Sequence, residues 1–361
     1  MYTTRRAAER RLRRSRPAPR RHSGDAGEPA GNPAQPRAVV PGHRDQGAAP
    51  PIDHAGIGLR CGVIPELSIV VASVESSRRI DAALTSLVAA APGTDAEVIV
   101  VDASHDDSAA RATRFDSVQV HRRAVGTLVP HLWADGIRLA RGRIVAVTTA
   151  HTVVGPAWAR ALIDALADRQ VGGVGGPLRL APTASALDAA IFFLRYSAFL
   201  PSRMPDGPVQ GEIAGDNAAY RRSDVLEDPA TLHDGFWEVP FHARLRAAGR
   251  TLVARQDALA EFGHAFPFRV IAAHRFRHGH EFGATRVTTG ARRRWQIIAA
   301  APLVPFVLAW RVIARVVADS VHRHRIPAAL PALLTLGGAW AAGEACGAFA
   351  ASHSDQGPTG V

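Results

Sequence analysis

Residues 96–107, AEVIVVDASHDD, constrain the fold more than any other stretch, because an apolar run there ends abruptly in a carboxylate. The residues VIVV before Asp102 show no polar alternation, which is typical of a strand in a sheet that helices cover on both faces. In open α/β sheets, ligands bind beyond the carboxyl ends of the strands. We therefore expect Asp102 to be a ligand-binding group at the rim of a pocket. Ser104 and Asp107 have the spacing of a capping box, so these two residues could instead begin the next helix.

Strand-like and helix-like segments alternate from residue 66 onward. The expected strands are 67–72, 98–101, 118–121 and 143–147, and the expected helices are 79–91, 108–114, 128–141 and 156–167. Because crossover connections are right-handed, this alternation predicts an α/β fold with parallel strands. Further along, GGVGGPLRL predicts a flexible lead-in to an extended segment, and residues 185–200 and 241–248 predict helices. The segment EIAGDNAAYRRS alternates like a strand toward the sheet edge.

Basic charge is concentrated in the first 60 residues. The chain of 361 residues has a formal net charge of +11, and residues 1–60 supply +7 of it through twelve arginines and five acidic residues. This segment is rich in Arg, Pro, Gly and Ala, so we expect a disordered basic tail. A weak tether to anionic lipid or nucleic acid remains open, and no specific nucleic-acid partner is expected. Cys61 and Cys346 lie far apart, which indicates neither a disulfide framework nor a metal motif.

Two apolar runs, 295–310 and 326–343, dominate a C-terminal region at 292–350. At 1.5 Å per residue the first run reaches about 24 Å, short of the roughly 30 Å hydrocarbon core of a bilayer. If Arg292–Arg294 are cytoplasmic, a spanning hairpin would also place four arginines on the far side, against the positive-inside rule. These are Arg311, Arg315, Arg323 and Arg325. We therefore expect membrane-associated helices lying in the cytoplasmic interface, with Trp295, Trp310 and Trp340 as interfacial aromatics. Two true spans, or a soluble helical pair, are the alternatives.

A series of motifs in a fixed order covers residues 65–286. The motifs are LSIVVAS with Glu75, ALTSL, EVIVVDASHDDSAA, GIRLARGRIVAV, Trp158, GDNAAYRRS and GFWEVPFHARLRAAG. Together they resemble family 2 glycosyltransferases of the GT-A fold. The resemblance implies a mostly parallel sheet flanked by helices. It also implies transfer of a sugar from a nucleotide diphosphate to an acceptor, usually with inversion and with the help of a general base.

The resemblance assigns roles to individual residues. Asp102 matches the acid that holds the nucleobase, commonly uracil, because a carboxylate can accept a hydrogen bond from the imide N–H. Ser73 and Glu75 match the other side of that pocket. Asp216, Asn217 and Trp237 match the acceptor side, with Asp216 also a catalytic candidate, and Glu238 matches the general base. Apolar neighbours of Glu238 are expected to raise its pKa, although this residue could equally be a helix-start acid ahead of Pro240.

The chain departs from the family pattern at the metal and at the base. Where the family has Asp-X-Asp, this chain has Thr149, Ala150 and His151, so His151 is the remaining candidate ligand for Mn²⁺ or Mg²⁺. Val239 stands at the usual base position, and Trp133 and Ala134 replace a usual Arg-Asn pair. With a weak metal site, other cations would have to stabilise the leaving diphosphate. The candidates are Arg275, Arg277, His278, His280 and Arg286, which could instead form a basic collar beside the membrane segments.

These observations predict a membrane-associated glycosyltransferase in three parts, namely a tail at 1–60, a GT-A-like domain at 65–286 and apolar helices at 292–350. The expected donor is a nucleotide sugar, with a UDP-sugar favoured, and the expected acceptor is a lipid-linked sugar or a cell envelope polysaccharide. The catalytic domain is expected on the cytoplasmic side of the cell membrane. The alternative function is a catalytically silent scaffold of the same fold that binds nucleotide sugars.

Overall fold

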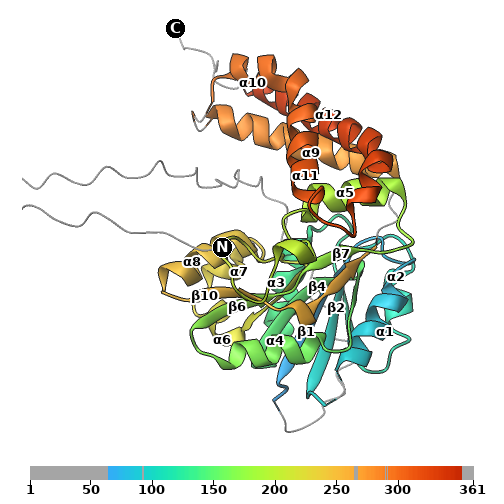
Figure 1. Ribbon diagram of the computed structural model, residues 1–361. Helices are drawn as coiled ribbons and strands as arrows, with labels where there is room; N and C mark the ends of the chain where they lie inside the picture. The colour runs from blue at the N-terminus through green and yellow to red at the C-terminus, as the bar shows by residue number, and fades with distance from the viewer. Residues whose placement is uncertain (1–63, 92, 264–266, 289, 291, 352–361) are drawn as a thin grey trace, which may run out of the picture. The chain divides into compact units, whose positions relative to one another are not determined.

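The computed structural model describes residues 64–351 apart from 92, 264–266, 289 and 291, so the predicted basic tail lies outside the described residues. An eight-stranded sheet with the order β3-β2-β1-β4-β9-β6-β10-β8 forms the centre of the fold (Figure 1). Its strands are β1 (Leu67–Ser73), β2 (Ala96–Asp102), β3 (Val118–Arg122), β4 (Ile144–Thr149), β6 (Val171–Gly175), β8 (Gly207–Pro208), β9 (Asn217–Arg221) and β10 (Thr251–Ala254). Strands β1 to β4 are mutually parallel, which confirms the predicted α/β fold.

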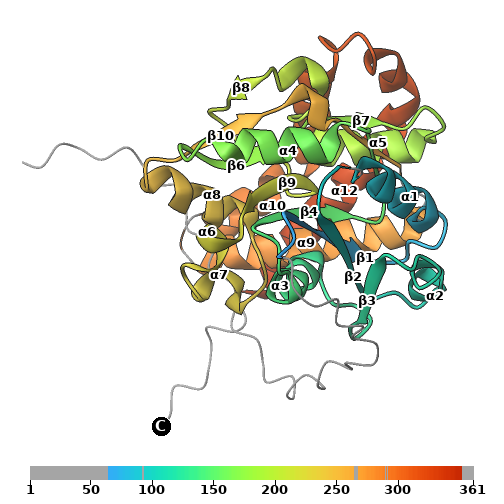
Figure 2. The same cartoon turned by 90° about the horizontal axis from the view of Figure 1, so that it is seen from below.

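Helices cover both faces of this sheet, and Figure 2 shows α3 and α4 on opposite sides of the strands. The helices of this part are α1 (Ile80–Ala90), α2 (Ser108–Ala112), α3 (Val129–Leu139), α4 (Trp158–Ala167), α5 (Ala186–Tyr196), α6 (Arg222–Leu226), α7 (Ala230–His233) and α8 (Glu238–Ala247). Alternate residues of each strand enter different cores. In β1, Ile69 and Val71 pack with α1 and α4, whereas Val70 and Ala72 pack with α3. The uninterrupted apolar runs of the sequence therefore correspond to strands buried on both faces.

Two predictions about the middle of the chain are wrong in detail. The glycine-rich segment is not a flexible lead-in but the buried strand β6, because larger side chains fill the space beside its glycines. A Cβ on Gly173 would lie 2.8 Å from the ring of Tyr220, and one on Gly175 would lie 2.8 Å from Ile213. The predicted strand in EIAGDNAAYRRS exists as β9, but it lies inside the sheet, antiparallel to β4 and β6.

A second sheet of three short strands was not predicted. It has the order β5-β11-β7 and consists of β5 (Thr152–Val154), β11 (Ala260–Phe262) and β7 (Leu178–Leu180). Strands of three residues are too short to show an alternating pattern, so only their pairing identifies them. This small sheet carries Phe262 and, directly after it, Gly263, both of which lie beside the predicted metal position, since the N–H of Gly263 donates to the carbonyl of His151 at 3.1 Å.

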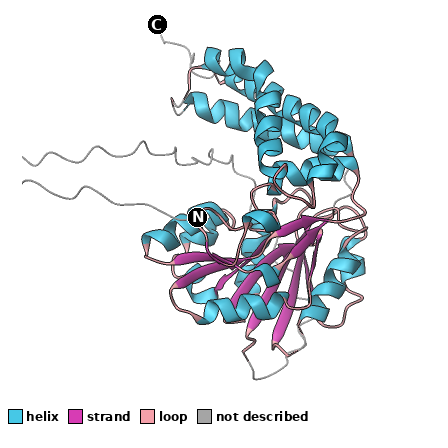
Figure 3. Ribbon diagram, viewed as in Figure 1, coloured by secondary structure: helices cyan, strands magenta, loops and turns pink. Residues whose placement is uncertain are grey.

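The C-terminal part consists of helices, as Figure 3 shows by colour. They are α9 (Phe268–Thr288), α10 (Arg294–Ala300), α11 (Val304–Val316) and α12 (Ile326–Ala350). A 3-10 turn joins α10 to α11, which makes the stretch Arg294–Val316 a helix of 23 residues, and Arg323–Ala350 has 28 residues. At 1.5 Å per residue the first stretch reaches about 35 Å, so the helix extends beyond the predicted apolar run 295–310 at both ends. By length and composition, both stretches could cross a membrane.

Helices α9 and α12 pack at very close range through glycines on both sides. A Cβ on Gly279 or Gly283 of α9 would lie 2.2 or 2.1 Å from a backbone oxygen of α12. A Cβ on Gly343 or Gly347 of α12 would lie 2.0 or 1.9 Å from a backbone oxygen of α9. Each helix therefore carries a G-x-x-x-G pair, the spacing that lets two helix backbones approach closely.

The C-terminal helices are attached to the sheet domain by specific bonds, with α5 in contact with α11 and α12. The N–H of Leu180 donates to Nε2 of His322 at 3.1 Å, and the ring of His322 stacks on Phe192 with centroids 5.6 Å apart. The hydroxyl of Ser202 donates to Asp319 at 2.6 Å. The helices and the sheet domain therefore share a buried, hydrogen-bonded contact.

Candidate functional site

The carboxyl ends of β1 and β2 meet as predicted, with Ser73 opposite Asp102 in the sheet register. The hydroxyls of Ser73 and Ser104 donate to Oδ1 of Asp102 at 2.6 and 2.7 Å, and the N–H of Ser104 donates to Oδ2 at 3.2 Å. Asp102 is fully buried by these partners. Its carboxylate lies at the predicted edge and fixes the two strand ends to each other. Direct contact of Asp102 with a nucleobase stays a prediction, because this carboxylate is enclosed.

Glu75 provides the half-exposed carboxylate at the same edge. Its φ of 48° is in the left-handed region, which is unusual for a residue with a Cβ. Two bonds hold it there: its N–H donates to the hydroxyl of Ser104 at 2.8 Å, and its carboxylate accepts from the N–H of His105 at 2.9 Å. The loop after β1 is therefore joined to the loop after β2, and this pair of loops forms one wall of the candidate nucleotide site.

The capping-box alternative for Ser104 and Asp107 is wrong. Helix α2 has Asp107 as its N-cap, but the side chain of Asp107 accepts no capping hydrogen bond. Asp106 instead accepts from the N–H of Ser108 at 3.0 Å and from the N–H of Ser77 at 3.1 Å. Ser104 hydrogen-bonds to Asp102, so its side chain joins the strand ends and does not cap the helix.

The carboxyl groups of Asp216 and Glu238 lie near each other, where β9 and α8 begin. A Cβ on Gly215 would lie 2.9 Å from Cδ of Glu238, so the carboxyl of Glu238 packs directly over the residue before Asp216. Asp216 is 5% exposed, accepts from Arg195 Nη2 at 3.1 Å and is bonded to the hydroxyl of Tyr196. Glu238 is also the first residue of α8, so it is both the helix-start acid and the candidate base that the sequence offered as alternatives.

Burial tunes both of these acids. It raises the pKa of Asp216, against an opposing effect of the positive charge on Arg195. Burial also raises the pKa of Glu238, and the nearby charge of Asp216 raises it further. A carboxylate whose pKa is moved toward neutrality is a better proton acceptor than an ordinary glutamate. The arrangement is therefore suited to general-base chemistry.

The two residues predicted on the acceptor side differ in accessibility. Asn217 is fully buried: its amide oxygen accepts from Trp158 Nε1 at 2.7 Å, and its amide nitrogen donates to the carbonyls of Ala258 and Pro177 at 2.9 and 3.2 Å. The structure thus gives Asn217 a packing role in place of acceptor contact. Trp237 is 42% exposed next to Glu238, so acceptor contact by its ring stays a prediction.

The residues at the predicted metal position do not fit a divalent cation. Thr149 is buried, with its hydroxyl 3.2 Å from that of Thr152. Nε2 of His151 lies 3.2 Å from the carbonyl of Val74, and burial lowers the pKa of His151 to about 4. Magnesium and manganese prefer several oxygen ligands, with carboxylates among them. Across the described part of the chain, no group of three or more His, Cys, Asp or Glu residues is placed to hold a metal.

The basic residues predicted to compensate for a weak metal site all belong to one C-terminal helix. They lie on α9, where the guanidinium of Arg275 stacks over Trp340 at 4.5 Å and Arg286 forms an ion pair with Glu344, both on α12. Arg277 and His278 are exposed on the same helix. The prediction that this set surrounds the leaving diphosphate is therefore corrected for Arg275 and Arg286, whose side chains join two helices.

Comparison with known proteins decides the family. Residues 68–227 match the family model described as glycosyl transferase family 2. The chain carries a family 2 glycosyltransferase domain. This match includes β1, β2, β4 and β9, the strands whose ends carry the candidate site, and it confirms the resemblance drawn from the sequence motifs.

One solved structure similar to this glycosyltransferase is the mannosyltransferase PcManGT from Pyrobaculum calidifontis in complex with GDP-Man and Mn²⁺. It has 18% sequence identity and a TM-score of 0.44, and the match covers 82% of this chain and 77% of that chain. A search among curated proteins gave no match.

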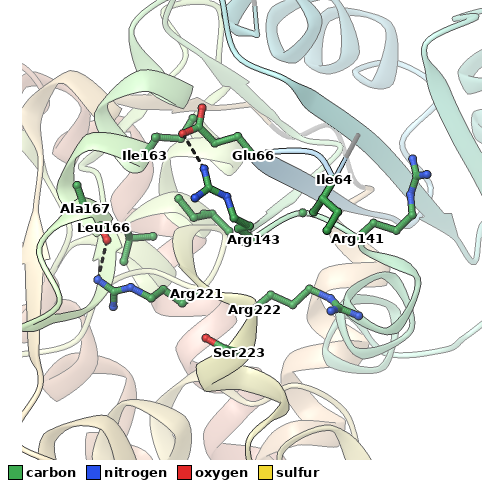
Figure 4. A pocket seen from close by; sticks show the side chains of 12 residues that line it. Ile64, Glu66, Arg141, Arg143, Ile163, Leu166, Ala167, Arg221, Arg222 and Ser223 are labelled. Atoms are coloured by element: carbon green, nitrogen blue, oxygen red, sulfur yellow. Dashed lines mark hydrogen bonds and ion pairs between the residues drawn. The ribbon is translucent and has the colours of Figure 1, made fainter. Parts of the chain in front are cut away.

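A basic cavity lies at the other end of the parallel strands of the glycosyltransferase domain. Its volume is about 580 Å³, and Figure 4 shows Arg141, Arg143, Arg221 and Arg222 along it. Three of these arginines form ion pairs: Arg141 with Glu97, Arg143 with Glu66, and Arg221 with Asp224. Because it lies at the amino ends of β1 and β4, this cavity is separate from the predicted site.

Sequence reasoning missed two arginines at the carboxyl edge, Arg79 and Arg195. Both are near enough to His151 for their charges to lower its pKa. All 43 basic residues of the chain other than histidine are arginines, so composition gave no reason to choose these two. Only the folded chain separates them from the arginines at the surface.

Proposed function

We propose that this glycosyltransferase moves a sugar from a nucleoside diphosphate sugar, preferably a UDP-sugar, to a lipid-linked or growing glycan acceptor. Glu238 is the general base, and the reaction inverts the anomeric carbon. The observation that carries the proposal is the carboxyl pair of Glu238 and Asp216 at the same sheet edge as Glu75 and Asp102. The family match to residues 68–227 supports sugar transfer as the reaction class.

The chemistry follows from the position of Glu238. An acceptor hydroxyl attacks the anomeric carbon and forms a new C–O bond, while the bond from that carbon to the diphosphate oxygen breaks. The hydroxyl proton passes to the carboxylate of Glu238, and the electron pair of the broken bond leaves with the diphosphate. A single displacement of this kind inverts the carbon, and the raised pKa of Glu238 favours proton transfer.

The alternative is a silent scaffold that binds nucleotide sugars without turnover. The observation in its favour is that Thr149, Ala150 and His151 occupy the position where the family has its metal-binding acids. The two functions differ in turnover, not in binding, so one assay separates them.

The experiment measures release of nucleoside diphosphate from a panel of nucleotide sugars, with the purified full-length chain. Turnover that disappears in Glu238→Gln supports the proposed function. The matched control is Glu227→Gln, which neutralises an exposed carboxylate elsewhere in the same domain and should leave turnover unchanged. Binding of a nucleotide sugar with no turnover by the unmodified chain would support the scaffold instead.

Membrane association is the second element of the proposal. Helix α11 and the turn before it carry large apolar side chains on one face, with Leu303, Phe306 and Trp310 each more than 60% exposed. The opposite face, with Ala309 and Val312, is buried. The exposed residues recur at helical spacing and follow Arg292–Arg294, so the face has the composition of a helix in the interface of an anionic bilayer.

Packing favours an interfacial position over a span for α12. In its C-terminal half, from Trp340 to Gly347, α12 contacts α9, which bears several Arg and His residues and is too polar for the hydrocarbon core. Glu344 of α12 is buried against Arg286 of α9. A helix tied to such a partner fits the surface of the membrane better than its centre. We propose that the sheet domain lies on the cytoplasmic side.

Cosedimentation with vesicles tests this arrangement. The chain should bind vesicles that contain phosphatidylglycerol, and Phe306→Ser with Trp310→Ser should release it while sugar-nucleotide binding persists. Val88→Ser removes an exposed apolar side chain of α1 and serves as the control. Equal vesicle binding by all three proteins would contradict a membrane role for this face.

A further inference from the structure

Two guanidinium groups lie near His151 at the carboxyl edge of the sheet. One belongs to Arg79, at the start of α1, and the other to Arg195, near the end of α5. Phe262 and Gly263, at the end of β11, connect the two positions. The ring of Phe262 has its centroid 6.5 Å from that of His151, and 6.0 Å from the guanidinium carbon of Arg195.

The guanidinium of Arg79 lies directly over Gly263. A Cβ on Gly263 would be 2.3 Å from both Cζ and Nη2 of Arg79, so a larger residue there would displace the guanidinium from this position. Gly263 is fixed in turn by its bond to the carbonyl of His151. Nε of Arg79 is buried and has no hydrogen-bond partner among the described residues. A buried donor without a partner is unfavourable, and an anion beside it would supply the missing acceptor.

Two further interactions hold Arg195 in place beside Phe262. Its Nη2 donates to Asp216 at 3.1 Å, and its guanidinium lies 4.9 Å from the centroid of the Tyr196 ring. The side chain is still 49% exposed, so part of its fork faces solvent. Arg195 thus contacts both Asp216 of the carboxyl pair and Phe262, the residue before Gly263.

We propose that Arg79 and Arg195 bind the diphosphate of the donor in place of a metal ion, so that nucleoside diphosphates bind without a divalent cation. The inference rests on the proposed function and names the groups that bind its donor. Guanidinium forks match phosphate oxygens in geometry and charge. They stabilise the negative charge that develops on the leaving diphosphate, which is the role that a hard cation fills at carboxylate-rich sites.

Two observations support this assignment. The residues at the metal position do not fit a hard cation, because Thr149 is buried with its hydroxyl 3.2 Å from that of Thr152, and Nε2 of His151 lies 3.2 Å from the carbonyl of Val74. The guanidinium of Arg79 lies over Gly263 and that of Arg195 lies beside Phe262, while the buried Nε of Arg79 has no hydrogen-bond partner among the described residues.

The test compares binding of diphosphates and monophosphates by the full-length chain. Dissociation constants for UDP, UMP, GDP and GMP are measured by calorimetry, once with excess EDTA and once with MnCl₂. The readout is the ratio of diphosphate to monophosphate affinity, which isolates the contribution of the terminal phosphate. Variants are Arg79→Gln, Arg195→Gln and the control Arg78→Gln, an exposed neighbour. Arg79→Lys and Arg195→Lys keep the charge if a glutamine variant fails to fold.

The expected ratio in EDTA is within about threefold of the ratio in MnCl₂. Loss of a charge-assisted bond should lower it about tenfold or more in Arg79→Gln and Arg195→Gln, and not in Arg78→Gln. Diphosphate binding that requires MnCl₂ would overturn the inference while leaving the proposed function intact. So would a ratio in EDTA that neither arginine variant changes. No binding of any nucleotide under either condition would refute the proposed function itself.

Discussion

Replacement of Glu238 by glutamine should abolish turnover and stabilise the fold at neutral pH. Burial and the charge of Asp216 raise the pKa of Glu238, so the ionised form is disfavoured in the folded chain. Glutamine has nearly the same shape and cannot ionise. The same substitution therefore removes a proton acceptor and a destabilising charge, and these two effects have opposite consequences for activity and stability.

The magnitudes follow from the two roles. General-base catalysis contributes about 10²- to 10⁴-fold to rate, so turnover should fall by about that factor. For stability, each unit by which the folded pKa exceeds the unfolded one is worth about 1.4 kcal/mol. A raised pKa contributes stability that is fully present below the unfolded value, 4.5 for Glu238, and is lost as the pH rises through the folded value. The gain from Glu238→Gln should therefore begin above pH 4.5 and be complete once the pH exceeds the folded value.

The assay measures Tm and kcat for the unmodified chain and for Glu238→Gln at a series of pH values. The Tm difference should be small near pH 4.5 and should grow toward neutrality in favour of the variant. In the unmodified chain kcat should rise with pH as Glu238 loses its proton. Glu227→Gln, the exposed control, should shift neither quantity. A variant that keeps its turnover, or whose Tm advantage does not change with pH, would refute the reasoning about Glu238.

Two glycine substitutions test packing at the site and between the helices. Gly215→Ala places a Cβ 2.9 Å from Cδ of Glu238 and should lower kcat about tenfold with little change in KM. The control Gly211→Ala places its Cβ in open space and should leave kcat unchanged. Equal kcat values for the two variants would contradict the placement of Glu238. Gly347→Ala places a Cβ 1.9 Å from a carbonyl of α9 and should destabilise by about 1–3 kcal/mol, whereas Gly338→Ala, on the same helix with no neighbour within 4 Å, should stabilise by up to about 1 kcal/mol. Denaturant unfolding monitored by circular dichroism distinguishes the second pair, and a stabilised Gly347→Ala would rule out the close contact.

The sequence by itself determined the α/β class and the parallel strands of the first half of the domain. The residues before Asp102 are all apolar because helices cover both faces of β2. This pattern depends only on that coverage, so it can be read without knowing the order of the strands in the sheet. The same logic placed Asp102 and Ser73 at one edge, since parallel strands end on the same side of a sheet. The sequence also identified Glu238 as an acid with apolar neighbours.

Tertiary structure alone decided which groups are accessible and which charges meet. Asp102 and Asn217 are buried and hydrogen-bonded, and no local pattern distinguishes a carboxylate that fixes two strands from one that faces a ligand. Arg79 and Arg195 lie far apart in the chain, and in the fold both lie beside the end of β11, where Arg195 faces Phe262 and Arg79 covers Gly263. This strand is too short to predict. Periodicity records which face of an element is covered, whereas charge placement depends on how distant elements pack, and that information is absent from any short stretch of residues.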